Sequence, residues 1–186
     1  MPIRWVALTG TPGVGKTTVA RSLRRAGFVV VDGADFAVKH RCVVGYDRKR
    51  KSKIVEPAYV GRELERAFPE DDDLRVLESH WSHAVPGVDA AIVLRLSPRR
   101  LGPRLSKRGW SKAKVRENLE AEVQHVILYE CLTHLGNQRV GELDMTRRTA
   151  ASAAKKIATV LRDPENRLTN LEIGRVDWTQ ELLRWY

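Results

Sequence analysis

The stretch GTPGVGKTT, residues 10–18, constrains the fold more than any other part of the chain. It has the spacing G-x4-G-K-T, whose glycines let the backbone curl so that N–H groups point toward an anion. An apolar run, residues 5–8, precedes it, and Val19 and Leu23 follow it at helical spacing. This context disfavours a plain glycine-rich turn. It predicts a strand, a phosphate-binding loop and a helix whose N-terminal dipole faces the anion.

The residues that close this loop indicate a nucleoside triphosphate with its metal ion. Lys16 is placed to reach the β- and γ-phosphates, and the Thr17 hydroxyl is placed to ligate Mg²⁺. We therefore expect the loop to be a P-loop that binds a nucleoside triphosphate together with Mg²⁺.

Composition limits the other possibilities. A chain of 186 residues suits one domain, and a net charge of +10 favours polyanionic partners such as a nucleotide, RNA or a ribosomal surface. Cys42 and Cys131 lie far apart in sequence, which fits two buried thiols in a reducing cytosol better than a disulfide framework. The N-terminus has no signal pattern, and no apolar run approaches the roughly 20 residues of a membrane helix. We expect a cytoplasmic protein with no membrane partner.

Apolar runs and helical patterns alternate along the chain. Strands are predicted at residues 3–9, 28–31, 74–78, 90–96 and 139–144. Helices are predicted from the P-loop to about residue 25, at 35–42, at 57–68, from 97 onward, and at 149–161, with a polar loop at 45–52. One long helix is predicted after Ser111, with one apolar face made of Val115, Leu119, Val123, Val126, Ile127 and Cys131. This alternation predicts an α/β fold with a parallel sheet.

Polar residues follow several of these strands. The P-loop and residues 32–35, 78–83 and 95–100 each come just after a predicted strand, so we expect them to converge at the carboxyl edge of the sheet. Glu78 could hold Mg²⁺ through water or order an attacking water, and His80 could orient a group or relay a proton. The alternative for His80 and His83 is a pair of loop histidines.

Five motifs in order make a resemblance specific. They are GTPGVGKTT, Gly45-Tyr46-Asp47, Glu78-Ser79-His80, Val93-Leu94-Arg95 and Arg108-Gly109-Trp110. Together they resemble the adenylate kinase 6 family, also called Fap7 or CINAP, and its archaeal members most, from residue 3 to about 161. The resemblance implies the P-loop nucleoside monophosphate kinase fold: a five-stranded parallel sheet flanked by helices, with a small lid and a monophosphate-binding segment. It speaks against a shikimate or gluconate kinase on the same fold.

The resemblance also divides the chain. It implies a kinase domain over residues 1–162, with the monophosphate-binding segment at about 32–57 and the lid at about 108–114. The remaining residues, 163–186, form a C-terminal extension. Because this extension holds Trp178 and Trp185, we expect it to dock on the same domain.

Site residues carry over from the resemblance by position. The implied catalytic residues are Lys16, Glu78, His80 and Arg108. The implied ATP-binding residues are Gly13, Val14, Gly15, Lys16, Thr17, Thr18, Arg108 in the lid and Arg148, with Arg147 as the alternative to Arg148. The implied Mg²⁺ ligands are Thr17 and Glu78, the latter directly or through water. Many eukaryotic members have Asp where this chain has Glu78, which is longer by one methylene.

The implied acceptor site departs from the kinase pattern. Adenylate kinases usually carry an arginine three residues after an aspartate like Asp35, and this chain has Val38 there. Arg41, one turn further, is the candidate replacement. Since positioning dominates phosphoryl-transfer catalysis, we expect weak phosphorylation of AMP relative to hydrolysis of ATP.

The resemblance implies two activities on one scaffold. One is an adenylate kinase that converts ATP and AMP to two ADP and also hydrolyses ATP. The other is an ATP-switched factor in small-subunit ribosome maturation that binds the platform ribosomal protein uS11 and has little AMP kinase activity. Basic residues at 48–51, Lys53 and the stretch 95–116 are candidates for rRNA contact or, within the latter, phosphate clamps. The alternative for the basic run at 48–51 is a solvated loop.

Overall fold

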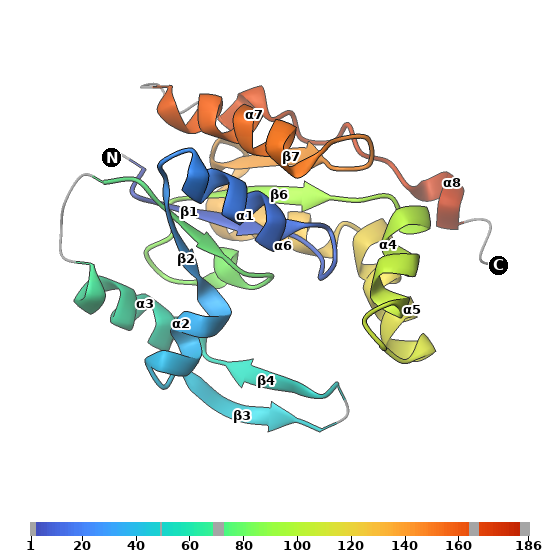
Figure 1. Cartoon of the computed structure of the whole chain (residues 1–186), viewed down its shortest axis with the longest axis horizontal. Helices are drawn as coiled ribbons and strands as arrows, with labels where there is room; N and C mark the ends of the chain where they lie inside the picture. Colours follow the sequence, from blue (N-terminus) through green and yellow to red (C-terminus); the bar gives the residue numbers. More distant parts are fainter. Residues whose placement is uncertain (1–2, 49, 69–72, 164–167, 183–186) are drawn as a thin grey trace.

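A five-stranded sheet forms the centre of the molecule (Figure 1). The computed structural model describes residues 3–48, 50–68, 73–163 and 168–182. Neighbouring strands run parallel in the order β2-β5-β1-β6-β7. Their bounds are β1 (Trp5–Thr9), β2 (Val29–Asp32), β5 (Arg75–Glu78), β6 (Ala90–Arg95) and β7 (Val140–Asp144). The predicted five-stranded parallel sheet is confirmed.

Helices cover both faces of the sheet, which explains why its central strands are apolar throughout. Successive residues of a strand point to opposite faces, so Val6 and Leu8 join one core cluster and Ala7 joins the other. The first cluster includes residues of α1 (Lys16–Arg25), α4 (Pro98–Ser106) and α7 (Ala150–Arg162). The second includes residues of α2 (Gly33–Lys39), α3 (Pro57–Ala67) and α6 (Val126–Leu135). Cys42 and Cys131 are free and buried in the second cluster, as expected.

The P-loop passes close to the sheet before α1 begins. Gly10 has φ +131°, and a Cβ atom there would lie 2.3 Å from the Leu94 carbonyl oxygen in β6. Gly15 precedes α1 with φ +117°. Side chains rarely adopt such dihedrals, so glycine is needed at both positions. The loop therefore leads directly from the carboxyl end of β1 to the N-terminus of α1.

Residues 43–55 differ from the prediction. We expected a polar loop at 45–52, but the chain forms an antiparallel hairpin of β3 (Val43–Asp47) and β4 (Ser52–Val55). The β-branched and aromatic residues on each side of the basic tip explain the two strands. The hairpin stands apart from the central sheet and reaches toward α5 (Lys112–Val123) (Figure 1). Lys49, one of the basic residues at the tip, lies outside the described residues.

The single helix predicted after Ser111 is also wrong. Helices α5 and α6 are separated at Gln124 and His125, and His125 has the left-handed φ of 56°. In a continuous helix the carbonyl of Glu122 would accept the N–H of the residue four positions on. Here that carbonyl accepts from the Arg95 guanidinium at 2.7 Å and from the His125 N–H at 3.3 Å. A tertiary contact therefore ends α5, while the apolar periodicity continues into α6.

The chain after α7 returns to the sheet. Leu168 and Leu171 are buried within the first core cluster, and the Leu171 carbonyl accepts the Glu142 N–H of β7 at 3.0 Å. The remaining short helices are η1 (Ser82–Ala84), η2 (Asn137–Arg139), η3 (Leu168–Asn170) and α8 (Thr179–Leu182). Trp185 lies outside the described residues. Among the described helices, none combines the length and the apolar character needed to cross a membrane.

Candidate active site

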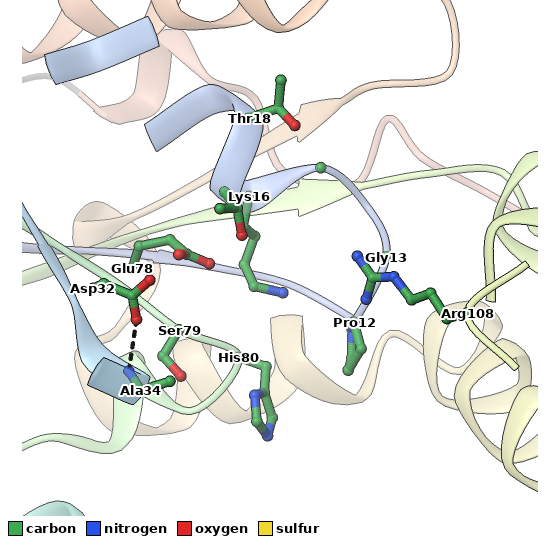
Figure 2. A pocket seen from close by; sticks show the side chains of 12 residues that line it. Pro12, Gly13, Lys16, Thr18, Asp32, Ala34, Glu78, Ser79, His80 and Arg108 are labelled. Carbon is green, nitrogen blue, oxygen red and sulfur yellow. Dashed lines mark hydrogen bonds between the residues drawn. The ribbon is translucent and has the colours of Figure 1, made fainter. Parts of the chain in front are cut away.

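A pocket of about 240 Å³ lies at the carboxyl edge of the sheet, in front of the P-loop (Figure 2). Three strand ends meet there, because the P-loop follows β1, Asp32 ends β2 and Glu78 ends β5. Arg108, which follows α4, reaches the same pocket from the opposite side. Its lining residues are Pro12, Gly13, Gly15, Lys16, Thr17, Thr18, Asp32, Ala34, Glu78, Ser79, His80 and Arg108.

Lys16 is the central cation of this pocket. Its side chain is buried, and Nζ donates to the carbonyl oxygens of Gly10 at 2.6 Å and Thr11 at 3.2 Å. The pKa of Lys16 is lowered to about 8, mainly by burial and to a smaller extent by Arg108, against the opposing effect of the Glu78 carboxylate. The ammonium group is therefore charged at neutral pH, and it lines a pocket at a helix N-terminus, which is a favourable place for an anion.

The acidic side of the pocket is made by Glu78 and Asp32 (Figure 2). Burial raises the pKa of Glu78, while Lys16 and a hydrogen bond from the Thr17 side chain lower it, and the nearby Asp32 raises it. Asp32 Oδ1 also accepts the N–H groups of Ala34 at 3.0 Å and Asp35 at 3.1 Å, so it caps α2. Two carboxylates thus stand beside the helix that begins at Lys16.

Two oxygen-bearing side chains of this pocket are suitable ligands for Mg²⁺. The Thr17 hydroxyl and the Glu78 carboxylate are hard oxygen ligands that line the same pocket. The described residues contain no group of three or more His, Cys, Asp or Glu side chains able to enclose a metal ion. Mg²⁺ does not need one, because it usually keeps several waters and binds through one or two protein ligands plus phosphate oxygens.

Two histidines follow β5 and have different surroundings. His80 is exposed at the pocket wall, where partial desolvation lowers its pKa, with Lys16 and His83 adding repulsion. Its imidazole is therefore neutral at pH 7. His83 is buried, with Nδ1 3.2 Å from the Thr9 hydroxyl and Nε2 3.1 Å from the Glu130 carboxylate. His80 can accept or donate a hydrogen bond at the site, whereas His83 is fixed behind it.

A second pocket, of about 500 Å³, adjoins the first on the far side of the P-loop. It shares Gly13, Gly15, Thr18 and Arg108 with the phosphate pocket. Arg104 lines it and donates to the Gly13 carbonyl at 3.3 Å. Arg148, after β7, completes the opposite wall. This pocket continues the P-loop outward, past the helix that begins at Lys16.

A third cavity, of about 690 Å³, adjoins the phosphate pocket on the other side, where both are lined by Pro12 and His80. It lies between the β3–β4 hairpin and α5. Trp81 and Trp110 line it, together with apolar side chains at the start of α6. An apolar cavity with aromatic walls suits a planar ring.

The rim of this cavity joins the hairpin to α5. Lys114 Nζ donates to the Arg50 carbonyl at 2.5 Å and lies 4.3 Å from the centroid of the Trp110 ring. Arg50 pairs with Glu117 at 2.8 Å and with Asp47 at 3.3 Å. Two cationic side chains thus bridge the hairpin and the helix beside the phosphate pocket.

The structure brings together most residues that the sequence singles out. Val14 and Arg148 line the second pocket, and the other expected ATP-binding and catalytic residues line the first. Asp35 and Arg41 are exposed and line none of the three pockets, and Arg41 has φ 59° at the end of α2.

Arg95 does not converge on the pocket, contrary to expectation. It is 2% exposed and pairs with Glu122 at 2.8 Å and Glu142 at 2.5 Å. Two charges therefore neutralise it inside the protein, so among the arginines at 95–116 it is no phosphate clamp.

Asp32 lies in the segment 32–35 that was expected to converge at this edge, and it lines the first pocket, although it was given no role of its own. Three residues of the third cavity, Arg50, Trp110 and Lys114, were not assigned to the site, and they reach it only because the hairpin folds toward α5. No local spacing in the sequence indicates that contact.

Comparison with known proteins agrees with this geometry. The family described as "AAA domain" matches residues 6–125. A Pyrococcus abyssi protein named "Putative adenylate kinase" is 38% identical over 177 residues, which cover 94% of this chain and 91% of that protein. An Archaeoglobus fulgidus protein of the same name is 35% identical over 177 residues, covering 95% and 93%.

Solved structures share the fold. A shikimate kinase from Acinetobacter baumannii, in complex with shikimate, has a TM-score of 0.59 at 14% identity, covering 86% of this chain and 93% of that one. TT1252 from Thermus thermophilus has a TM-score of 0.56 at 21% identity, covering 86% and 97%. At these identities the likeness concerns the fold alone. The archaeal relatives and the domain match show more: the chain belongs to one family with those archaeal proteins, within the P-loop nucleoside monophosphate kinase superfamily, and it is a nucleotide kinase.

Proposed function

We propose that this kinase transfers the γ-phosphoryl group of ATP to AMP and so forms two ADP. The observation that carries the proposal is the row of three adjoining pockets. The P-loop pocket lies in the middle, a pocket lined by Arg104 and Arg148 continues it on one side, and the apolar cavity adjoins it on the other. A phosphoryl transfer between two nucleotides needs this order of donor, phosphates and acceptor.

The donor half assigns roles to the P-loop residues. Lys16 and Arg108 would stabilise the negative charge of the transferring phosphoryl group, and Arg104 would assist from α4. The Thr17 hydroxyl would hold Mg²⁺, with Glu78 acting directly or through water. When bound, Mg²⁺ would neutralise part of the negative charge of the nucleotide phosphates.

The acceptor half determines how fast the transfer is. Val38 is 48% exposed and offers no charge to an acceptor phosphate. Arg41 lines none of the three pockets, whereas Arg50 and Lys114 line the apolar cavity. We propose that these two cations, already held by α5 and the hairpin, provide part of the missing grip. Because both also hold other partners, AMP phosphorylation should be slow relative to a kinase with a dedicated clamp.

A second candidate is an ATP-switched assembly factor that binds the ribosomal protein uS11 and rRNA. The hairpin favours it, because Val44, Tyr46 and Ile54 are each about half exposed beside the basic Arg48 and Lys53. Exposed apolar side chains within a basic surface suit a macromolecular partner. In this reading ATP hydrolysis, with Glu78 and His80 ordering the attacking water, would reset the lid. The free cysteines support a cytoplasmic setting for either function.

One experiment separates the two candidates. ATP labelled at the γ-position is incubated with Mg²⁺ and the protein alone, with AMP, and with purified uS11, and a Lys16→Ala variant serves as the inactive control. Label that appears in ADP in the presence of AMP supports the kinase. Phosphate release that exceeds ADP labelling and responds to uS11 supports the assembly factor. No AMP-dependent label in ADP, under conditions where ATP binds, refutes the proposed AMP kinase.

A further inference from the structure

A buried charged cluster lies behind the P-loop and outside the phosphate pocket. Its centre is the carboxylate of Glu122, in the last turn of α5. Glu122 Oε2 accepts the Thr11 hydroxyl at 2.6 Å, and Oε1 accepts Arg95 Nε at 2.8 Å and the Leu96 N–H at 3.0 Å. Thr11, Glu122 and Arg95 are each 2% exposed. Such charge-assisted contacts, shielded from water, hold their partners more firmly than surface pairs do.

The guanidinium of Arg95 holds the Glu122 carboxylate in place. It also donates to the Glu142 carboxylate at 2.5 Å, to His125 Nδ1 at 2.8 Å and to the Glu122 carbonyl at 2.7 Å. Glu142 in turn accepts the Gly174 N–H at 2.9 Å. With its donors occupied on several sides, Arg95 cannot turn without breaking buried bonds, so Glu122 has one position.

Thr11 links the Glu122 carboxylate to the P-loop through hydrogen bonds of both its hydroxyl and its carbonyl. It does not line the phosphate pocket, but its carbonyl accepts the Val14 N–H at 3.3 Å and Lys16 Nζ at 3.2 Å. The first of these bonds closes the turn of residues 11–14, and the second holds the lysine. The hydrogen bond from the Thr11 hydroxyl to Glu122 therefore restrains the turn of residues 11–14, and this turn positions the P-loop glycines and Lys16.

Glu122 also connects the P-loop to the helix that follows the lid. Glu122 lies in the last turn of α5, and α5 begins just after the Arg108–Trp110 turn and carries Lys114. We propose that Glu122 is a positioning residue for nucleotide binding. It holds the P-loop turn through the Thr11 hydroxyl and so joins that turn to the C-terminal end of α5. It acts through Thr11 and does not line the phosphate pocket.

The test compares Thr11→Val, which keeps the shape and removes the hydroxyl, with Thr11→Ser, which keeps the hydroxyl. The dissociation constant for a fluorescent N-methylanthraniloyl ATP with Mg²⁺ is measured, together with kcat and KM for ATP and the Tm. Loss of a buried hydrogen bond to a carboxylate predicts about a tenfold weaker affinity for Thr11→Val, and a higher KM. Thr11→Ser should bind within about twofold of the wild type. Thr159→Val, the same change on the exposed side of α7, should bind like the wild type.

A second variant tests the carboxylate itself. Glu122→Gln keeps the volume, and its amide oxygen can stay on Arg95 and the Leu96 N–H, which leaves the amide nitrogen to face the Thr11 hydroxyl. The charge-assisted bond that Thr11 donates is thereby lost, and only a weaker neutral contact remains. Affinity should again fall about tenfold, and combining Glu122→Gln with Thr11→Val should weaken it by less than the product of the two effects, because both act through one contact. Thr11→Val alone keeps the test open if Glu122→Gln does not fold.

The outcomes separate this inference from the proposed function. Wild-type affinity in Thr11→Val with a lowered Tm would overturn it, since the contact would then serve stability alone. So would a Thr11→Ser variant as weak as Thr11→Val. The inference rests only on nucleotide binding at the P-loop. A wild-type protein that binds the ATP analogue without phosphorylating AMP therefore refutes the proposed AMP kinase and leaves the role of Glu122 in place.

Discussion

Replacing Arg95 by methionine leaves two buried carboxylates without their shared cation. Glu122 and Glu142 are 2% and 1% exposed at the side chain, so water cannot take the place of the guanidinium without opening the core. Methionine fills much of the volume, so the change removes charge and hydrogen bonds more than packing. The expected effect is therefore electrostatic.

The magnitude follows from the burial of the cluster. Removing one partner of a buried ion pair costs about 3–5 kcal/mol. For a chain of this size each kcal/mol lowers Tm by about 2–4 °C, so Arg95→Met should lower it by roughly 6–20 °C. Arg99→Met is the matched control, because Arg99 is 63% exposed and its Nε lies 3.9 Å from Glu181. That surface change should stay within about 0.5 kcal/mol.

The loss should also depend on pH. Burial raises the pKa of Glu142, and the Arg95 guanidinium is the largest influence that opposes the rise. Without Arg95 the pKa rises further. A carboxyl whose pKa is higher in the folded state contributes stability below its ordinary pKa of 4.5, and that contribution is lost as pH rises through the folded pKa. The difference between Arg95→Met and the wild type should therefore be larger at pH 8 than at pH 5.

Urea denaturation followed by circular dichroism at pH 5 and pH 8 measures both quantities. Adding Glu142→Gln to Arg95→Met removes one of the two stranded charges and should recover part of the loss at pH 8. An equal loss at both pH values, or a loss no greater than that of Arg99→Met, would refute the reasoning, because the cluster would then contribute through packing alone.

Three further expectations concern single residues. Because burial lowers the pKa of Lys16 to about 8, ATP affinity measured by titration should fall as pH rises above 8, and Lys16→Arg, which stays charged, should give a flatter profile. Gly102→Ala in α4 should raise the unfolding free energy by about 0.5–1 kcal/mol, since its Cβ would lie an ordinary 3.6 Å from Leu119 Cδ1; a lower Tm would contradict this. Burial raises the pKa of Cys131 to about 12, so mass spectrometry after iodoacetamide treatment at pH 8 should find Cys131 unmodified in the native protein and modified in urea.

The features that the sequence predicts well are those with local causes. Glycine spacing, the lysine and the flanking apolar run predicted the P-loop because each acts on its own few residues. Buried apolar runs predicted the five parallel strands, and the carboxyl ends of those strands then placed Glu78 and His80 beside Lys16. No long-range contact had to be known for any of these.

The features that it misses depend on distant partners. The basic run at 48–51 led to the prediction of a polar loop where β3 and β4 form a hairpin. The apolar cavity exists only because the tip of that hairpin contacts Lys114 and Glu117 on α5. The break between α5 and α6 follows from an arginine 27 residues away that binds the Glu122 carbonyl. Apolar periodicity carries no trace of such a bond.

Arg95 shows why basic residues near a strand end cannot be assigned from spacing alone. Arg95 is the last residue of β6, Arg104 and Arg108 follow it in the same arginine-rich stretch, and by sequence each could be a phosphate clamp. A buried guanidinium needs carboxylates to offset its desolvation, and Arg95 has two, from positions 122 and 142. Once paired in this way it has no charge to offer a phosphate. Arg104 and Arg108 are exposed and line the pockets, so their charge faces the space that a ligand could occupy. Burial therefore separates these arginines: Arg95 is paired with carboxylates inside the core, whereas Arg104 and Arg108 keep their charge at the pocket walls.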